Sequence, residues 1–355
     1  MKNYVFLICS ERSGSNLICS ILRQHNQVHS PLPLQLFRDL SLNFFLLDQS
    51  DIKSLKESFE WKILVKNIVR KYRNFYSEQA SIDVLNYFAN ADNLSFKKIF
   101  LDLIAIDLKY SPQTSSNHSI IFLKENNFHK IALQILIYFP DAKFVFQVRD
   151  PRDYMASCLD RAKDKGFLGN KFNSSFRALE LWKLDQMAGL NALKHLGPSR
   201  VFVQKYEDLI EHPEKVLSKL CSFLHIQYMS SMLNFFESEQ EVKLAIPGGP
   251  RENLSKPIIK NNKNKYLKVL DADLIRRVEI YLSPLMIHFN YELTEFNNKK
   301  DKDINSLLFD IFYLKFSEPI EKNTNGDNKS PWYSEGLDLT TDPFFTPTYR
   351  VNFPY

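Results

Sequence analysis

Four short and almost uninterrupted apolar runs, separated by long segments with helical periodicity, constrain the fold of this chain more than any other feature. A run without polar alternation is typical of a strand that is buried on both faces of a parallel sheet. Strands that alternate with helices require crossover connections, which place helices on both faces of the sheet. The runs occupy residues 4–9, 120–123, 143–148 and 200–204. We therefore predict a three-layer α/β fold with a central parallel sheet of four to five strands.

The chain's 355 residues are enough for one large domain or two small ones, and an apolar fraction of 44% supplies a sizeable core. The sequence changes in character after residue 293, where a charged stretch, NNKKDKD, leads into a turn-rich segment without a period. We predict one folded domain over residues 1–293 and a C-terminal appendage or tail over residues 294–355. Within the domain, we expect a helical insert at about residues 36–118 on the substrate side.

Composition narrows the choice of partners and of compartment. A formal net charge of +5 is too small to indicate a nucleic-acid partner. The N-terminal apolar run of about six residues is too short for a signal-peptide core or a membrane span. The four cysteines are scattered, without a C-x-x-C pair or a metal-ligand spacing, which is typical of reduced core residues. We predict a cytoplasmic protein without a membrane span or a metal site.

The first motif, CSERSGSN at residues 9–16, lies where the first apolar run meets a helical pattern. A strand that turns tightly into a helix exposes backbone N–H groups at the positive end of the helix dipole, where anions bind. Gly14 lets the backbone approach an anion closely, and Arg12 adds a permanent forked charge. Ser13, Ser15 and Asn16 add side-chain donors. The motif is P-loop-like, but it lacks the lysine and the second glycine of a kinase loop, and taken alone it also fits an ordinary turn with a serine N-cap.

The second motif, FVFQVRDPRDYMAS at residues 144–157, is a buried strand that runs into a helix. Arg149 stands at the carboxyl end of this strand, the edge at which open α/β sheets bind ligands. Ser157 follows eight positions later, about two helical turns on, so both side chains could reach one anion. The alternative is structural: an ion pair of Arg149 with Asp153, or of Arg152 with Asp150.

Two further stretches carry candidate ligand contacts. In VFVQKYEDL at residues 201–209, Tyr206 could stack on a nucleotide or hydrogen-bond to it, whereas we expect Glu207 and its neighbour Asp208 to anchor loops. The loop GGPRENLSKP at residues 248–257 is rich in glycine and basic residues. We predict that Arg251 binds a ligand there, while Lys256 fits a solvated surface equally well.

Taken together, the motifs resemble the sulfotransferases that use 3′-phosphoadenosine 5′-phosphosulfate (PAPS), in particular their bacterial and tyrosylprotein-type branch. The resemblance extends from Tyr4 to about Leu293. It implies that Arg12 and the loop from Ser13 through Gly14 and Ser15 to Asn16 hold the phosphosulfate. It implies that Arg149 and Ser157 hold the 3′-phosphate, that Tyr206 marks the next landmark, and that Arg251 belongs to a loop that closes over the nucleotide.

The resemblance also implies the reaction. A sulfuryl group moves in line from PAPS to a hydroxyl or amine of a small-molecule, lipid or glycan acceptor, and 3′-phosphoadenosine 5′-phosphate (PAP) leaves without help from a metal. The protein's task is then to position the reactants and to stabilise spread negative charge. Two alternatives stay open: a weakly active or non-catalytic nucleotide-binding module of the same fold, and a small-metabolite kinase.

The general base is where this sequence departs from the family. Lys124 matches the family's lysine near the transferring group, but Asn126 stands where many members carry a catalytic histidine. Three candidates remain, in the order Glu125, His129 and His29. A carboxylate in a partly desolvated cleft can act as a base, although Glu125 could instead stabilise the start of the following helix. His29 is expected to be a surface histidine.

Overall fold

The computed structural model describes residues 2–42, 52–91, 95–111, 118–126, 128–162, 175–245, 249 and 251–294. All of them belong to one compact unit, Met1–Asp310. The appendage predicted at residues 294–355 lies outside the described residues except for Thr294, so the boundary at residue 293 stays a prediction.

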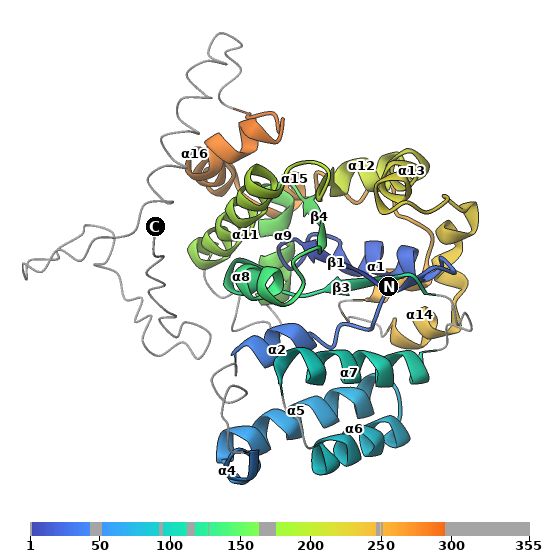
Figure 1. Ribbon diagram of the computed structural model, residues 1–355. Helices are drawn as coiled ribbons and strands as arrows, with labels where there is room; N and C mark the ends of the chain where they lie inside the picture. The colour runs from blue at the N-terminus through green and yellow to red at the C-terminus, as the bar shows by residue number, and fades with distance from the viewer. Residues whose placement is uncertain are drawn as a thin grey trace, which may run out of the picture. The chain divides into compact units, whose positions relative to one another are not determined.

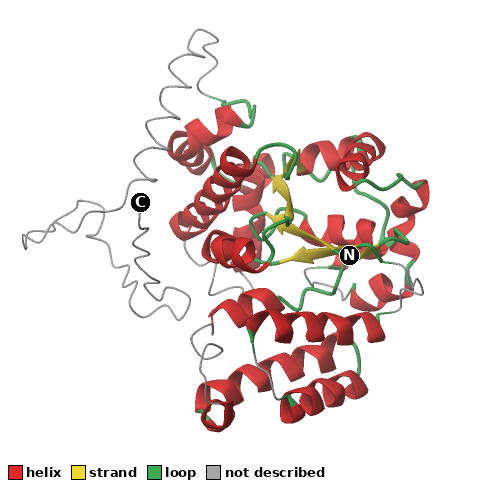
Figure 2. Cartoon of the chain, viewed as in Figure 1, coloured by secondary structure: helices red, strands yellow, loops and turns green. Residues whose placement is uncertain are grey.

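One five-stranded sheet, in the order β2-β3-β1-β4-β5, forms the centre of the fold, and every neighbouring pair of strands is parallel (Figures 1 and 2). The strands are β1 Asn3–Ile8, β2 Val28–His29, β3 Ile120–Lys124, β4 Lys143–Val148 and β5 Val201–Lys205. The predicted parallel α/β fold is confirmed, and the four apolar runs agree with four of the strands to within one residue at each end. The fifth, β2, is a two-residue edge strand.

Alternate residues of β1 point to opposite faces of the sheet, and both faces are covered. Val5 and Leu7 belong to a fully buried cluster with α1 (Ser15–Arg23) and α13 (Pro213–Leu224). On the other face, Phe6 contacts the rings of Phe37, Phe139 and Phe144. Figure 1 shows α8 (Phe128–Tyr138) and α11 (Ser175–Leu196) on one side of the sheet and α1 on the other. Each phenylalanine buried in this way contributes roughly 1.5–3 kcal/mol of stability.

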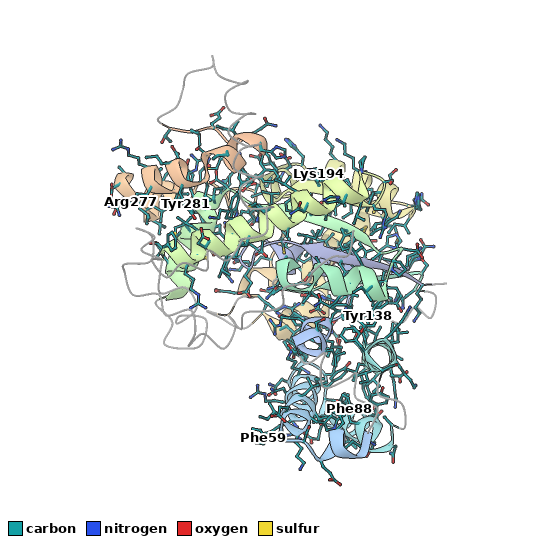
Figure 3. All side chains as sticks on the ribbon, turned by 60° about the vertical axis from the view of Figure 1, so that its left-hand side comes forward. Phe59, Phe88, Tyr138, Lys194, Arg277 and Tyr281 are labelled. Carbon is teal, nitrogen blue, oxygen red and sulfur yellow. The ribbon has the colours of Figure 1, made fainter. Side chains whose placement is uncertain are left out.

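Five helices fill the described part of the segment between β2 and β3. They are α2 Leu36–Leu42, α4 Ile52–Glu57, α5 Phe59–Phe75, α6 Glu78–Asn90 and α7 Phe96–Tyr110. Serine side chains cap two of them, because Ser58 accepts from the N–H of Trp61 at 3.2 Å and Ser77 accepts from that of Ala80 at 3.1 Å. Figure 3 shows Phe59 and Phe88 on the group of helices farthest from the sheet. Whether this segment is the substrate-side insert stays a prediction.

His29 is not a surface residue, which corrects the expectation from the sequence. It lies in β2 with its side chain fully buried, and its Nε2 is 2.6 Å from Oδ1 of Asp107 on α7. The other oxygen, Oδ2, accepts the hydroxyl of Tyr76 at 2.5 Å. A buried imidazole requires hydrogen-bonding partners, and a helix that is distant in the sequence supplies them here. The pair joins the edge strand to the helices that cover it.

The start of α9 (Pro151–Ala162) carries a buried ion-pair network. Arg152 donates from Nε and Nη2 to the two oxygens of Asp150, at 3.0 and 2.7 Å, and from Nη1 to Glu279 at 2.6 Å. Glu279 belongs to α16 (Ala272–His288), so the network fixes the last described helix to the end of β4. Of the two structural pairs left open as alternatives, the structure therefore contains that of Arg152 with Asp150.

Smaller elements complete the described chain: α12 Tyr206–Glu211, η1 Ser230–Glu237, α14 Glu239–Leu244, η2 Glu252–Ser255 and α15 Tyr266–Val269. All four cysteines are buried, as predicted for core residues, and all four are free thiols. In the part of the chain that the structure describes, no helix combines the length and the apolar character needed to cross a bilayer. Within that same part, no three histidine, cysteine, aspartate or glutamate side chains gather as a metal would require.

Candidate active site

The loop that follows β1 has an unusual backbone at two positions. Arg12 has a φ of 70° and Gly14 a φ of 80°, both in the left-handed region. Glycine adopts this conformation without strain, whereas for a residue such as arginine it costs on the order of 1–3 kcal/mol. A Cβ atom on Gly14 would lie 2.3 Å from Cδ2 of Tyr206, so the site also lacks space for a side chain. The left-handed backbone and the close packing against Tyr206 together restrict the conformation of the loop.

Helix α1 begins directly after this turn. Gly14 is its N-cap and, as a glycine, has no side chain with which to cap the first backbone N–H groups. Gly14, Ser15 and Asn16 line a cavity of about 610 Å³. The N-terminus of a nine-residue helix thus faces a cavity, an arrangement that favours an anion.

The cavity combines a cationic edge with an apolar wall. Arg12, Lys124, Arg149 and Arg251 supply the cations among the described lining residues. The apolar wall is formed by Leu17, Pro33, Phe75, Ile210, Phe235, Leu244, Leu254, Pro257, Ile258 and Ile259. A site lined in this way fits a ligand that carries both anionic groups and an apolar body.

Arg149 stands at the carboxyl end of β4, where the sequence predicted it. Its Nη1 donates to the backbone oxygen of Arg12 at 2.6 Å, and its guanidinium lies 4.8 Å from the centre of the Tyr206 ring. Its Nε has no partner among the described residues, although the side chain is only 6% exposed. A buried donor without a partner is costly, and an anionic ligand in the cavity would remove that cost.

Ser157 contacts Arg12 in this structure. Its Oγ accepts from Nε of Arg12 at 3.0 Å. Ser157 is not among the described residues that line the cavity, whereas Arg149 is. The two residues predicted to share one anion therefore meet at Arg12, Arg149 through the backbone oxygen and Ser157 through the side chain.

Tyr206, the first residue of α12, joins the loop to the cavity wall. Its ring lies between Gly14 and Arg149, and its hydroxyl accepts from Nδ2 of Asn262 at 2.5 Å. Burial raises the pKa of Tyr206, so the hydroxyl stays protonated at neutral pH. Its neighbour Glu207 accepts from the N–H of Asp150 at 2.9 Å and thereby anchors the loop after β4, as predicted.

Arg251 lines the cavity from the basic loop, together with Gly249. Its Nη2 donates to Glu241 at 3.3 Å, and the other oxygen of this fully buried carboxylate accepts from Arg23 of α1. Nε and Nη1 of Arg251 have no partner among the described residues, and the residue is 6% exposed. Lys256 is exposed and does not line the cavity.

Lys124 ends β3 and lines the cavity. Its Nζ donates to Oδ1 of Asn16 at 2.7 Å, so it is fixed against the first turn of α1. Burial lowers the pKa of Lys124, and the nearby Glu11 carboxylate acts in the opposite direction.

Glu125 faces the start of α2. Its two oxygens accept from the backbone N–H groups of Phe37 at 3.0 Å and Arg38 at 3.2 Å, and it is not among the described cavity residues. Burial raises the pKa of Glu125 to about 7. It serves the start of α2, whereas the sequence suggested the helix that follows it in the chain. His129 belongs to α8, but its side chain lies outside the described residues, so both residues stay predictions as bases.

Sequence reasoning missed Glu11, which lines the cavity beside Arg12. Its Oε1 accepts from Nδ2 of Asn126 at 2.9 Å, across 115 positions of the sequence. The only sequence signal for Glu11 is its position, as a carboxylate next to the loop arginine. The contact with Asn126 arises from the pairing of β1 with β3 and has no local signature.

The chain matches a profile described as the sulfotransferase family over residues 4–230, more than half of its length. It is 23% identical over 166 residues to a protein-tyrosine sulfotransferase of Drosophila melanogaster, covering 46% of this chain and 33% of that protein. It is 20% identical over 215 residues to protein-tyrosine sulfotransferase A of Caenorhabditis elegans, covering 60% of this chain and 53% of that protein. The chain thus spans between a third and about half of these relatives.

Two solved structures share the fold. The sulfotransferase domain from the curacin biosynthetic pathway has a TM-score of 0.56 and 20% identity, covering 82% of this chain and 99% of that domain. The sulfotransferase domain from the Synechococcus PCC 7002 olefin synthase has a TM-score of 0.56 and 21% identity, covering 79% and 96%. The fold agrees in both cases, and the match over residues 4–230 shows that this chain belongs to the sulfotransferase family.

Proposed function

We propose that the protein transfers a sulfuryl group from PAPS to a hydroxyl or amine of an acceptor and releases PAP. One observation carries the proposal. Arg12, Arg149 and Arg251 reach the same cavity from three separate segments, and three buried guanidinium nitrogens of Arg149 and Arg251 have no partner among the described residues. A nucleotide with anionic groups at both its 5′ and 3′ ends answers this distribution of cations.

Different residues bind the 5′ and 3′ ends of the nucleotide. The N–H groups from Ser13 to Asn16 hold the 5′ end, and Arg12 stabilises the sulfuryl group and the leaving phosphate. Arg149 holds the 3′-phosphate, with Ser157 fixing the side chain of Arg12 nearby. Tyr206 and Arg251 close the nucleotide side of the cavity. Selection of a 3′-phosphate would exclude ATP.

The remaining part of the cavity receives the acceptor. Lys124 lies near the transferring group, and the apolar wall, with Pro33 in the loop before α2 and Phe75 at the end of α5, suits an uncharged body next to the reacting hydroxyl. A small molecule, a lipid or a glycan with such a surface is the proposed acceptor. A cytoplasmic location stays a prediction.

Isothermal titration with PAP, ATP and ADP tests the nucleotide site. We expect micromolar binding of PAP and binding of ATP that is weaker by about tenfold or more, since one charged contact is worth on the order of 1.5–3 kcal/mol. Equal binding of ATP and PAP would contradict the proposal and favour the kinase.

A screen of acceptors with sulfur-labelled PAPS tests the reaction. Transfer should occur with the parent chain and with Ser230→Ala, an exposed control, and should be lost in Arg12→Ala. Selective binding of PAP without transfer to any acceptor would instead support the non-catalytic module.

A further inference from the structure

Glu11 is the one carboxylate among the described residues that line the cavity, and no histidine lines it in that part of the chain. Three buried carboxylates near the site are not among the described lining residues and bind other groups of the fold. Glu125 accepts two backbone N–H groups of α2, Glu241 binds two arginines, and Asp153 accepts the N–H groups of residues 264 and 266. A proton acceptor that can meet a ligand in the cavity is therefore found at Glu11.

The sheet fixes where this carboxylate lies. Leu7 of β1 pairs in register with Lys124 of β3, so the segments that follow the two strands leave the sheet side by side. Glu11 follows β1, and Asn126 follows β3. The amide of Asn126 donates to Oε1 of Glu11 at 2.9 Å, and Asn126 is only 7% exposed. The carboxylate is thus held next to Arg12 and on the same edge as Lys124.

We propose that Glu11 is the general base that accepts the proton of the acceptor hydroxyl, and that Asn126 is a positioning residue that orients it. The inference rests on the proposed function. As the acceptor oxygen forms its bond to sulfur, the bond from sulfur to the 5′-phosphate oxygen breaks, and its electron pair stays on PAP. The hydroxyl proton passes to the carboxylate of Glu11, which later releases it to water.

The surroundings of Glu11 suit a base that must be ionised before it acts. Arg12 is the next residue on the same loop, and Lys124 at the end of β3 interacts with the charge of Glu11. From α9, Tyr154 and Cys158 also interact with its charge, and burial raises the pKa of both, so they stay neutral. The described groups around Glu11 thus include two cations and two neutral side chains.

The test compares Glu11→Gln with Glu214→Gln, the same change at an exposed position of α13. Both receive sulfur-labelled PAPS and a series of acceptors, from 4-nitrophenol, which ionises readily, to weakly acidic phenols and an aliphatic alcohol. Glu11→Gln should lose transfer to the weakly acidic acceptors by about 10²–10⁴-fold and transfer to ionised 4-nitrophenol far less. Its affinity for PAP, measured by titration, should stay within about threefold of the parent.

Variants of Asn126 separate orientation from folding. Asn126→Asp places a second carboxylate beside Glu11, so the acid limb of the pH–rate profile should move to higher pH while PAP binding persists. Asn126→Ala should lower kcat without changing the affinity for PAP. An unchanged pH profile in Asn126→Asp would overturn the positioning role.

The outcomes distinguish the inference from the function beneath it. If Glu11→Gln transfers sulfate as well as Glu214→Gln to every acceptor, Glu11 is not the base, and the sulfotransferase proposal stands. If the parent chain does not prefer PAP to ATP, the proposed function itself fails. A parent chain that binds PAP but transfers to no acceptor, water included, overturns the role of Glu11 as a base.

Discussion

Arg149 and Arg152 are three positions apart at the end of β4, and both are almost fully buried, at 6% and 4% exposure. The guanidinium of Arg152 donates from Nε, Nη1 and Nη2 to two carboxylates, Asp150 and Glu279. Arg149 pairs with no carboxylate among the described residues, and its Nε has no partner there. The protein neutralises Arg152 with carboxylates, whereas Arg149 has the incomplete pairing that the proposed anion site requires.

The same contrast separates the cavity from the rest of the buried polar groups. His29, Asp107 and Tyr76 bond to one another under the covering helices, whereas two nitrogens of Arg251 have no partner in the described structure. Burial alone therefore does not mark a functional charge, because structural charges are buried too. Under the proposed function, a functional charge is instead recognised by its incomplete pairing at a cavity.

The largest expected effect on stability follows from breaking the closed network. Arg152→Met should lower the free energy of unfolding by about 3–5 kcal/mol, because two buried carboxylates lose their cation. Denaturant unfolding measures it. Arg277→Met on α16, labelled in Figure 3, removes an exposed pair with Asp273 and should change stability by about 0.5 kcal/mol or less. Similar losses in both variants would remove the distinction between the arginines.

The open site should respond in activity. Arg12→Gly should reduce sulfuryl transfer by about 10²–10³-fold, because a charge next to the leaving phosphate is lost. Its stability should change by less than about 1 kcal/mol, since glycine relieves the left-handed backbone at φ 70° while adding freedom to the unfolded chain. Transfer assays and denaturant unfolding on the same preparations check both. A large loss of stability would show that Arg12, like Arg152, has a mainly structural role.

Gly14→Ala should destabilise the protein by about 2–3 kcal/mol, from backbone strain and from the clash with Tyr206. Gly197→Ala is a matched control, because Gly197 has a φ of 74° and nothing within 4 Å of its Cβ position. It measures the backbone term alone. If both variants lose equal stability, close packing against Tyr206 contributes nothing to the shape of the loop.

The last prediction concerns the pH dependence at Glu125, whose folded pKa of about 7 exceeds its ordinary value of 4.5. The native state therefore binds this proton more tightly, and stability falls as pH rises from about 4.5 to about 7. Glu125→Gln should remove this dependence, so the parent should lose about 3 kcal/mol relative to the variant across that range, at about 1.4 kcal/mol for each pKa unit. Unfolding curves at several pH values measure it, with Glu214→Gln expected to keep the parent's profile.

The fold was predictable because long apolar runs encode buried parallel strands locally. Residues 143–148 coincide with β4, and Arg149 and Tyr206 occur at the strand ends where the sequence predicted them. The edge strand β2 has only two residues, too few for any periodicity. The burial of His29 in this strand was not predicted either, because it depends on Asp107 of a helix that is distant in the sequence.

The candidate site was predictable only in its local motifs. The turn at Arg12 and Gly14 is visible in six consecutive letters, but the partners of its residues are not. Glu11 meets Asn126 through strand pairing, and Glu125 reaches α2 across 88 positions. Side-chain direction at a strand end decides which of Lys124, Glu125 and Asn126 enters the cavity, and no sequence pattern reports that direction.

The hydrogen bond from Arg149 to the backbone oxygen of Arg12 makes the two ends of the site a single mechanical unit. Under the proposed function, the side chain that selects one end of the nucleotide also sets the backbone that grips the other. In that case, a nucleotide without the 3′-phosphate leaves the loop at Arg12 less constrained. The proposal therefore implies that the 3′-phosphate affects the rate of transfer as well as the affinity for the nucleotide.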